Sequence, residues 1–169
     1  MRRTAFATAF SGLAIAGPVA AADITVTVEI PKLTVAEYHR PFVALWVENA
    51  EGKAVKTLAV WYDVKGEGEN WLKDIRTWWR KAGRETSMPA DGISGATRSA
   101  GRHQLNFAAG KGPLGSLPPG SYTLVAEAAR EVGGREMLKT PFTWPPKKAQ
   151  TASVKGQEEL GGLSIALKP

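Results

Sequence analysis

The first part of the chain alternates strand-like runs with turn residues. Residues 24–30 alternate β-branched with polar side chains, which predicts a strand with one buried face that ends at Pro31. Residues 41–48 form a more continuously apolar run, and residues 55–62 form another. The turn-like residues 49–53 separate the two runs. Together these runs predict a β-hairpin.

Residues 70–83 break this alternation. Large apolar side chains recur there at the spacing of one helix face: Trp71, Leu72, Ile75, Trp78 and Trp79. Asn70 suits the N-cap and Gly83 suits the position after the last helical residue. The segment therefore predicts one amphipathic helix, with Trp71 and Trp78 packed against a sheet.

The second half of the chain predicts more strands. Runs of strand-like sequence occupy residues 101–107, 121–130, 136–142 and 163–167. A stretch rich in glycine and proline, residues 110–120, predicts a loop between the first two. About seven short strands with turn signals between them predict an all-β fold, an immunoglobulin-like antiparallel β-sandwich with one inserted amphipathic helix.

The first 22 residues have the features of an export signal. A positive start at residues 1–3 precedes an apolar stretch at residues 5–17 and small residues at 20–22. We expect a cleaved signal peptide over residues 1–22 and a β-sandwich domain over residues 23–169. The mature protein is then periplasmic or otherwise extracytoplasmic, and does not itself span the membrane. Arg2-Arg3 also fits the twin-arginine route, although the general secretory route is favoured.

Composition narrows the function classes. The formal net charge is +6, but two of the basic residues lie in the leader and the others are scattered among acids. We therefore expect no nucleic-acid partner. Cysteine is absent, which excludes disulfides and metal or iron–sulfur sites held by thiolates.

Familiar catalytic constellations are not evident. His39 and His103 are far apart and have no acid at metal-ligand spacing, so structural or surface roles are favoured. The acidic pairs at 67/69 and 158/159 lie in charged, loop-like sequence and are expected to be solvated. We therefore expect an electron carrier or a binding module rather than an enzyme.

The stretch between the predicted helix and the later strands carries the most specific motif. Residues 91–97 read Asp-Gly-Ile-Ser-Gly-Ala-Thr, and they resemble the Asp-x-x-Ser-Gly-Ala-Thr motif that FAD:protein FMN transferase modifies. That motif occurs in the covalent-flavin subunits of the sodium-pumping NADH:quinone oxidoreductase and of the Rnf complex. The resemblance implies FMN on Thr97 through a phosphoester bond, with Asp91 as a recognition residue for the transferase.

The surroundings of Thr97 complete the predicted cofactor site. Its loop has to be thin and exposed to enter another enzyme's active site, and Gly95 and Ala96 permit that close approach. Arg98 and Arg102 are placed to offset the phosphate charge. Trp79 or an aromatic residue of the hairpin is expected to border the loop and stack on a planar ligand. The candidate cofactor-binding residues are Thr97, Asp91, Ser94, Gly95, Ala96, Arg98 and Trp79.

A second resemblance covers most of the mature chain. Residues 38–48, 55–62, 71–80, 91–97 and 117–124 resemble a family of predicted periplasmic bacterial proteins catalogued as a domain of unknown function. Its members resemble parts of exported electron-transfer systems, which implies an FMN transferase and a membrane-bound PepSY-type reductase as partners. The known FMN-carrying subunits do not share the β-sandwich expected here, so only their motif carries over.

These observations favour an exported electron-transfer flavoprotein that relays electrons between a membrane reductase and an extracytoplasmic acceptor. The alternative is a non-redox, immunoglobulin-like periplasmic binding module with an unmodified loop. A hydrolase using Asp91 and Ser94 is a third possibility, disfavoured because the sequence places no base near Ser94.

Overall fold

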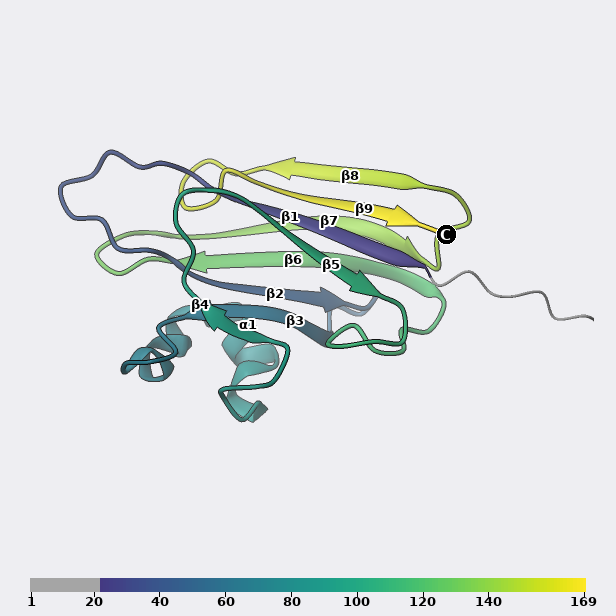
Figure 1. Ribbon diagram of the computed structural model, residues 1–169, viewed down its shortest axis with the longest axis horizontal. Coiled ribbons are helices and arrows are strands. Elements are labelled where there is room, and N and C mark those ends of the chain that lie inside the picture. Colours follow the sequence, from purple (N-terminus) through teal and green to yellow (C-terminus); the bar gives the residue numbers. More distant parts are fainter. Residues whose placement is uncertain (1–21) are drawn as a thin grey trace, which may run out of the picture.

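The computed structural model describes residues 22–169 as two β-sheets packed face to face (Figure 1). Apart from Ala22, the predicted signal peptide lies outside the described residues. One sheet has four strands in the order β5-β1-β9-β8, and all its pairings are antiparallel. Its strands are β1 (Asp23–Ile30), β5 (Gly101–Ala108), β8 (Gln150–Lys155) and β9 (Gly162–Lys168).

The other sheet has five strands in the order β4-β3-β2-β6-β7. They are β2 (Phe42–Glu48), β3 (Ala54–Tyr62), β4 (Ser94–Ala96), β6 (Gly120–Ala129) and β7 (Arg135–Trp144). Strands β2 and β3 form the predicted hairpin, and among residues 22–169 only the β3–β4 pairing is parallel. The prediction of an all-β sandwich with an inserted helix is confirmed.

The main core fills the space between the sheets. Alternate residues of β1 are buried there, as its two-residue pattern predicted: Ile24, Val26, Val28 and Ile30. Residues of β2, β6 and β9 meet them from the other strands, among them Leu45, Leu124 and Ile165. At the start of β6 the Tyr122 hydroxyl donates to the Pro118 carbonyl at 2.7 Å. This contact resembles the tyrosine corner of β-sandwich domains.

A second core lies on the outer face of the five-stranded sheet. Trp46 and Tyr62 point outward from β2 and β3 and pack against Leu72, Ile75 and Trp78. Figure 1 shows the helical segment beneath β2 and β3, on the side away from β8 and β9. Because β2 is buried on both faces, its sequence is continuously apolar rather than alternating.

The prediction of a single helix over residues 70–83 is wrong in extent. The segment consists of a 3₁₀ helix η1 (Gly68–Asp74), the helix α1 (Arg76–Lys81) and a 3₁₀ turn η2 (Gly83–Glu85). Ile75 separates the first two, with φ −78° and ψ 72°. The buried carboxylate of Glu127 then accepts hydrogen bonds from the amides of Thr77 and Trp78 at 3.0 and 2.9 Å. The N-terminus of the α-helix is therefore capped by a carboxylate from β6. Local sequence cannot predict a capping group that comes from a distant strand.

Two strands were not predicted. Strand β8 carries the polar sequence QTASVK and forms one edge of its sheet, so its hydrophobic signal is weak. Strand β4 has three residues within the predicted loop. Its pairing with β3 joins positions more than 30 residues apart, which local periodicity does not report.

Buried carboxylates join loops to the sheets. Glu159, expected to be solvated, is 4% exposed and forms two hydrogen bonds with Arg130 at 2.8 and 3.1 Å, so that prediction is wrong. Glu48 is also buried and accepts from Lys81, Lys139 and the Trp46 indole. Burial alone would raise the pKa of Glu48, but these three donors outweigh it and hold the pKa below its usual value.

No helix among residues 22–169 is long and apolar enough to cross a membrane.

Candidate functional site

The motif segment, residues 91–97, lies at the edge of the five-stranded sheet. Its β4 pairs with the end of β3, with Ser94 opposite Val60 and Gly95 opposite Trp61. Asp91, Ala96 and Arg98 are exposed, whereas Ser94, Gly95 and Thr97 are half-buried. The expected thin, exposed loop is thus anchored as a strand over three residues, and Thr97 follows directly after them.

Trp61 explains why a glycine precedes Ala96. A Cβ atom built on Gly95 would lie 3.3 Å from Cδ1 of Trp61, tighter than most natural Cβ contacts, so the indole would have to shift slightly. The Arg98 guanidinium lies 5.3 Å from the centroid of the same indole, within cation–π range. The His103 ring meets it edge-on at 5.7 Å. An aromatic residue of the hairpin, Trp61, therefore borders the motif. This was one of the two predicted possibilities, the other being Trp79.

Ser94 has a structural contact of its own. Its Oγ accepts a hydrogen bond from the Ala90 amide at 2.8 Å and lies 4.0 Å from the sulfur of Met88. The amide of Ser94 donates back to the Ala90 carbonyl at 2.9 Å. These contacts close the turn that leads into β4. Within residues 22–169 no base contacts the Ser94 hydroxyl, so the geometry does not favour a serine hydrolase.

Thr97 lines a surface cleft of about 430 Å³, here called the Thr97 cleft. Its walls come from three other parts of the chain that the fold brings together at one end of the five-stranded sheet. They are residues 38–42 before and within β2, residues 63–71 after β3, and Glu131 after β6. Aromatic side chains dominate the apolar part of this wall: Tyr38, Phe42 and Trp71.

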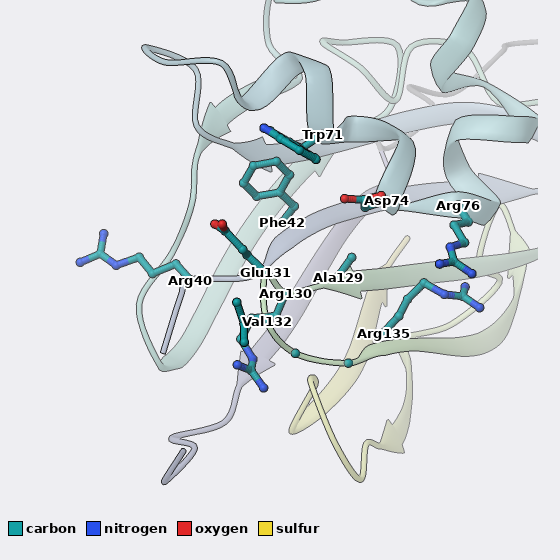
Figure 2. A pocket seen from close by; sticks show the side chains of 12 residues that line it. Arg40, Phe42, Trp71, Asp74, Arg76, Ala129, Arg130, Glu131, Val132 and Arg135 are labelled. Atoms are coloured by element: carbon teal, nitrogen blue, oxygen red, sulfur yellow. The ribbon is translucent and has the colours of Figure 1, made fainter. Parts of the chain in front are cut away.

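A second cleft of about 480 Å³, the arginine cleft, adjoins the first. The two clefts share Arg40, Phe42, Trp71 and Glu131, so they lie side by side on the surface and are together called the groove here. Figure 2 shows Trp71 and Phe42 together at one end of the arginine cleft. Arg76 and Arg135 lie at the other end, and the Arg40 side chain points outward. The groove therefore has an aromatic middle and a cationic far end.

The tryptophans of the helical segment have different surroundings. Trp78 is fully buried, as predicted, but the expected packing of Trp71 in the core is wrong, because Trp71 is 53% exposed. A 3₁₀ helix has three residues per turn, so Leu72 and Ile75 share the face toward the sheet while Trp71 is turned to the groove. Trp79 lines a further depression with Lys73 and Arg80, which adjoins the arginine cleft at Arg76 and Arg135. Trp79 is not among the residues of the Thr97 cleft or of the arginine cleft.

The Thr97 cleft contains charges of both signs. Asp63, Glu67 and Glu131 contribute carboxylates, and Arg40 and His39 are the basic residues. The His39 ring lies 2.7 Å from a Glu37 oxygen and 3.5 Å from a Glu131 oxygen. The hydrogen bond to Glu37, followed by the charge of Glu131, raises the pKa of His39 above its usual value. A cationic imidazole beside Thr97 is therefore favoured at higher pH than for an isolated histidine.

Sequence reasoning did not find this wall. Tyr38, Phe42 and Trp71 are more than 25 residues from Thr97, and Trp71 had an ordinary explanation as core. Their grouping depends on where the β1–β2 connection and η1 lie in the fold. The exposure of a tryptophan within a short 3₁₀ helix is evident from the structure but not from the sequence.

The family described as Predicted periplasmic protein (DUF2271) matches residues 23–162. The chain belongs to this family. The match confirms the predicted periplasmic location and the resemblance that covers most of the mature chain. The family description concerns location alone. No curated protein and no solved structure matches the chain. In the part of the chain that the structure describes, no cluster of three or more histidine or acidic side chains is arranged to hold a metal ion.

Proposed function

We propose that this protein is a periplasmic electron-transfer flavoprotein that carries FMN covalently on Thr97. It would relay electrons between a membrane-bound reductase, of the PepSY type by the resemblance above, and an extracytoplasmic acceptor. The observation that carries the proposal is the coincidence of motif and cleft. The last residue of the Asp-x-x-Ser-Gly-Ala-Thr motif is the one that lines an aromatic cleft.

The residues around Thr97 suit a flavin in size and chemistry. Both clefts fall within the volume range of small-molecule sites. Tyr38, Phe42 and Trp71 offer planar surfaces for an aromatic ring. Arg40 and the charged form of His39 are the groups in the Thr97 cleft that would favour a phosphate, against three carboxylates that would oppose it.

Attachment needs only a hydroxyl and an activated phosphate. Thr97 Oγ would bond to the FMN phosphorus of FAD in the active site of the FMN transferase. The phosphoanhydride bond would break, AMP would leave, and the hydroxyl proton would pass to a base of the transferase. Asp91 is exposed on the motif segment and remains available to the transferase. Gly95 and Ala96 keep the segment before Thr97 narrow.

Bound FMN would supply one- and two-electron transfer, and the protein would hold it and set its surroundings. Arg98 follows Thr97 directly, but its guanidinium lies over Trp61, so it would have to turn to reach a phosphate. Arg102 lies on β5, opposite Glu29 of β1. Of the two, Arg98 is the closer in sequence to the attachment point.

The test is the intact mass of the exported protein after co-expression with an FMN transferase. We expect an added mass of FMN less water in the wild type and in Ser99→Ala, but none in Thr97→Ala. Ser99 is a matched control because its hydroxyl is exposed only two residues away. Modification that persists in Thr97→Ala would overturn the assignment of Thr97. An unmodified wild type, with the transferase active on a control substrate, would overturn the flavoprotein proposal.

The composition of the groove also supports a second candidate, a periplasmic binding module. Tryptophan and arginine dominate many binding hot spots, and Trp71, Arg40 and Arg76 all line the arginine cleft. Under this alternative the motif segment stays unmodified. A colourless periplasmic protein of unmodified mass would favour it.

A further inference from the structure

Trp71 is exposed without any role in the cores of the protein. It is absent from both buried clusters, and 53% of its surface is accessible. Its ring has Lys73 Nζ at 5.4 Å from the centroid, and Figure 2 shows it next to the Phe42 ring at the edge of the arginine cleft. A large aromatic side chain held in this way exposes apolar surface that a ligand could cover.

The groove connects this indole with Thr97. Thr97 lines the first cleft, whereas Trp71 and Phe42 line both. A group tethered to the Thr97 oxygen can therefore reach Trp71 without leaving the groove. The expected occupant of the groove is the FMN attached to Thr97. Because it is covalently attached, it is always present at high local concentration.

Val132 continues the apolar surface at the mouth of the arginine cleft. It is 69% exposed and has a φ of 51°, a conformation that β-branched residues rarely adopt. Such strain is typical of binding and active sites. Val132 lies in the β6–β7 turn, where the Gly133 amide donates to the Arg130 carbonyl at 3.0 Å, and the turn holds its apolar side chain at the cleft.

We propose that the isoalloxazine ring of the FMN on Thr97 docks in this groove and stacks on Trp71, rather than moving freely outside the protein. This inference rests on the proposed function and adds the residue that positions the ring. Trp71 would cover one face of the planar ring, with Phe42 beside it, and the open side of the groove would leave an edge of the ring accessible to redox partners. Trp79 has no part in this arrangement because it is not among the residues of either cleft.

The test compares FMN-loaded wild type with Trp71→Phe, Trp71→Ala and the control Trp79→Phe. Intact mass verifies that each protein carries FMN, and flavin fluorescence intensity and anisotropy report the ring. An indole in contact with a flavin quenches its emission, whereas a phenyl ring can stack without quenching. Because Trp71 is half exposed, its substitution is expected to leave the fold intact.

We expect Trp71→Phe to brighten the flavin while its anisotropy stays high. Trp71→Ala should brighten it and lower the anisotropy, with a fall of about 2- to 10-fold in the ratio of docked to free ring. Trp79→Phe should match the wild type in both readouts.

Two results would overturn the inference. If FMN is attached and emission is the same in wild type and in both Trp71 variants, the ring does not touch Trp71, and the carrier function still stands. If Trp79→Phe rather than Trp71→Phe brightens the flavin, the ring lies on the other tryptophan. A wild type that acquires no FMN mass would remove the proposed function and this inference together.

Discussion

The helical segment between β3 and β4 has two sides with opposite properties. On the side toward the sheet, Trp78 is fully buried and its indole nitrogen donates to the Thr57 hydroxyl at 3.1 Å. On the side toward the groove, Trp71 is half exposed and lines two clefts. The two residues are seven positions apart, close to two helical turns, and an unbroken α-helix would place them on one face. The break at Ile75 separates a tryptophan that stabilises the fold from one that is free to bind.

The charged groups follow the same division. On the sheet side, Glu127 is fully buried and accepts from two helix amides and from Arg135. On the groove side, the Arg40 and Arg76 side chains form no hydrogen bond or ion pair within residues 22–169, whereas Arg130 and Arg135 of the same cleft are paired with Glu159 and Glu127. Polar groups that the fold leaves unpartnered next to exposed aromatic surface are typical of a site for a ligand. The residues that stabilise the fold therefore lie on the sheet side of the segment, and the residues that could bind a ligand lie on the groove side.

The largest effect should come from exchanging the two tryptophans for alanine. Trp78→Ala leaves a large cavity in the second core and should lower the free energy of unfolding by about 3–5 kcal/mol. Trp71→Ala should lower it by less than about 1 kcal/mol, since its side chain is largely solvated. Urea denaturation followed by far-ultraviolet circular dichroism measures both. Equal losses in the two variants would show that Trp71 belongs to the core after all.

A smaller loss is expected on removing the carboxylate that caps α1. Glu127→Ala leaves the amides of Thr77 and Trp78 without their acceptor and should cost about 1–3 kcal/mol. Glu127→Gln should cost less, because one amide oxygen can still accept. Glu67→Ala, in the Thr97 cleft, is the matched control and should leave the denaturation midpoint unchanged. A midpoint that moves as far in the control as in Glu127→Ala would contradict the division between the two sides.

The parts of the fold that follow local periodicity could be predicted from the sequence. The alternation in β1 and the apolar run of β2 gave correct strands, because burial on one or both faces leaves a direct mark on the side chains. The helix was predicted in the right region but as a single element. The start of α1 after the break is capped by Glu127, about 50 residues away, and no local pattern reports that contact.

The candidate site could be predicted only in part, for the same reason. The motif identified Thr97, and the nearby Trp61 was among the aromatic residues considered. Trp71 was assigned to the core because it shares the helical spacing of Trp78. Tyr38 and Phe42 were not singled out for a site, since only the packing of the β1–β2 connection beside η1 and Thr97 gives them a cleft to line.

A further effect on the sheet side depends on pH. The pKa of Glu48 is held below its usual value of 4.5 by Lys81, Lys139 and Trp46, despite burial that opposes this. Its contribution to stability is therefore present above the unfolded pKa and is lost as pH falls through the lower folded pKa. Urea denaturation between neutral and acidic pH should show a decline below about pH 4.5 that is weaker in Glu48→Gln. Identical pH dependence in the two proteins would mean that another carboxylate controls the decline.

The smallest effect, on the groove side, is the titration of His39. Its pKa is raised first by the hydrogen bond to Glu37 and then by Glu131, so Glu37→Gln should lower it toward the ordinary value of 6.5. Because the folded pKa is raised, any stabilisation is complete below pH 6.5 and disappears as pH rises through the folded pKa. His39 is partly exposed and its two acidic partners are well exposed, so this stabilisation is too small for denaturation to detect. The measurement is a nuclear magnetic resonance titration of the ring protons, in protein with and without FMN.

Attachment of FMN adds a negative phosphodiester at Thr97, which lines the same cleft as His39, so the pKa of His39 should rise further in the loaded protein. Loaded Glu37→Gln should show the same increment from its lower starting point, because the two negative charges act on the imidazole from separate positions. An unchanged His39 in the loaded wild type would place the phosphate away from this side of the cleft. The FMN chain would then leave Thr97 in another direction before its ring reaches Trp71. Arg98 would become the next cation to test for contact with the phosphate.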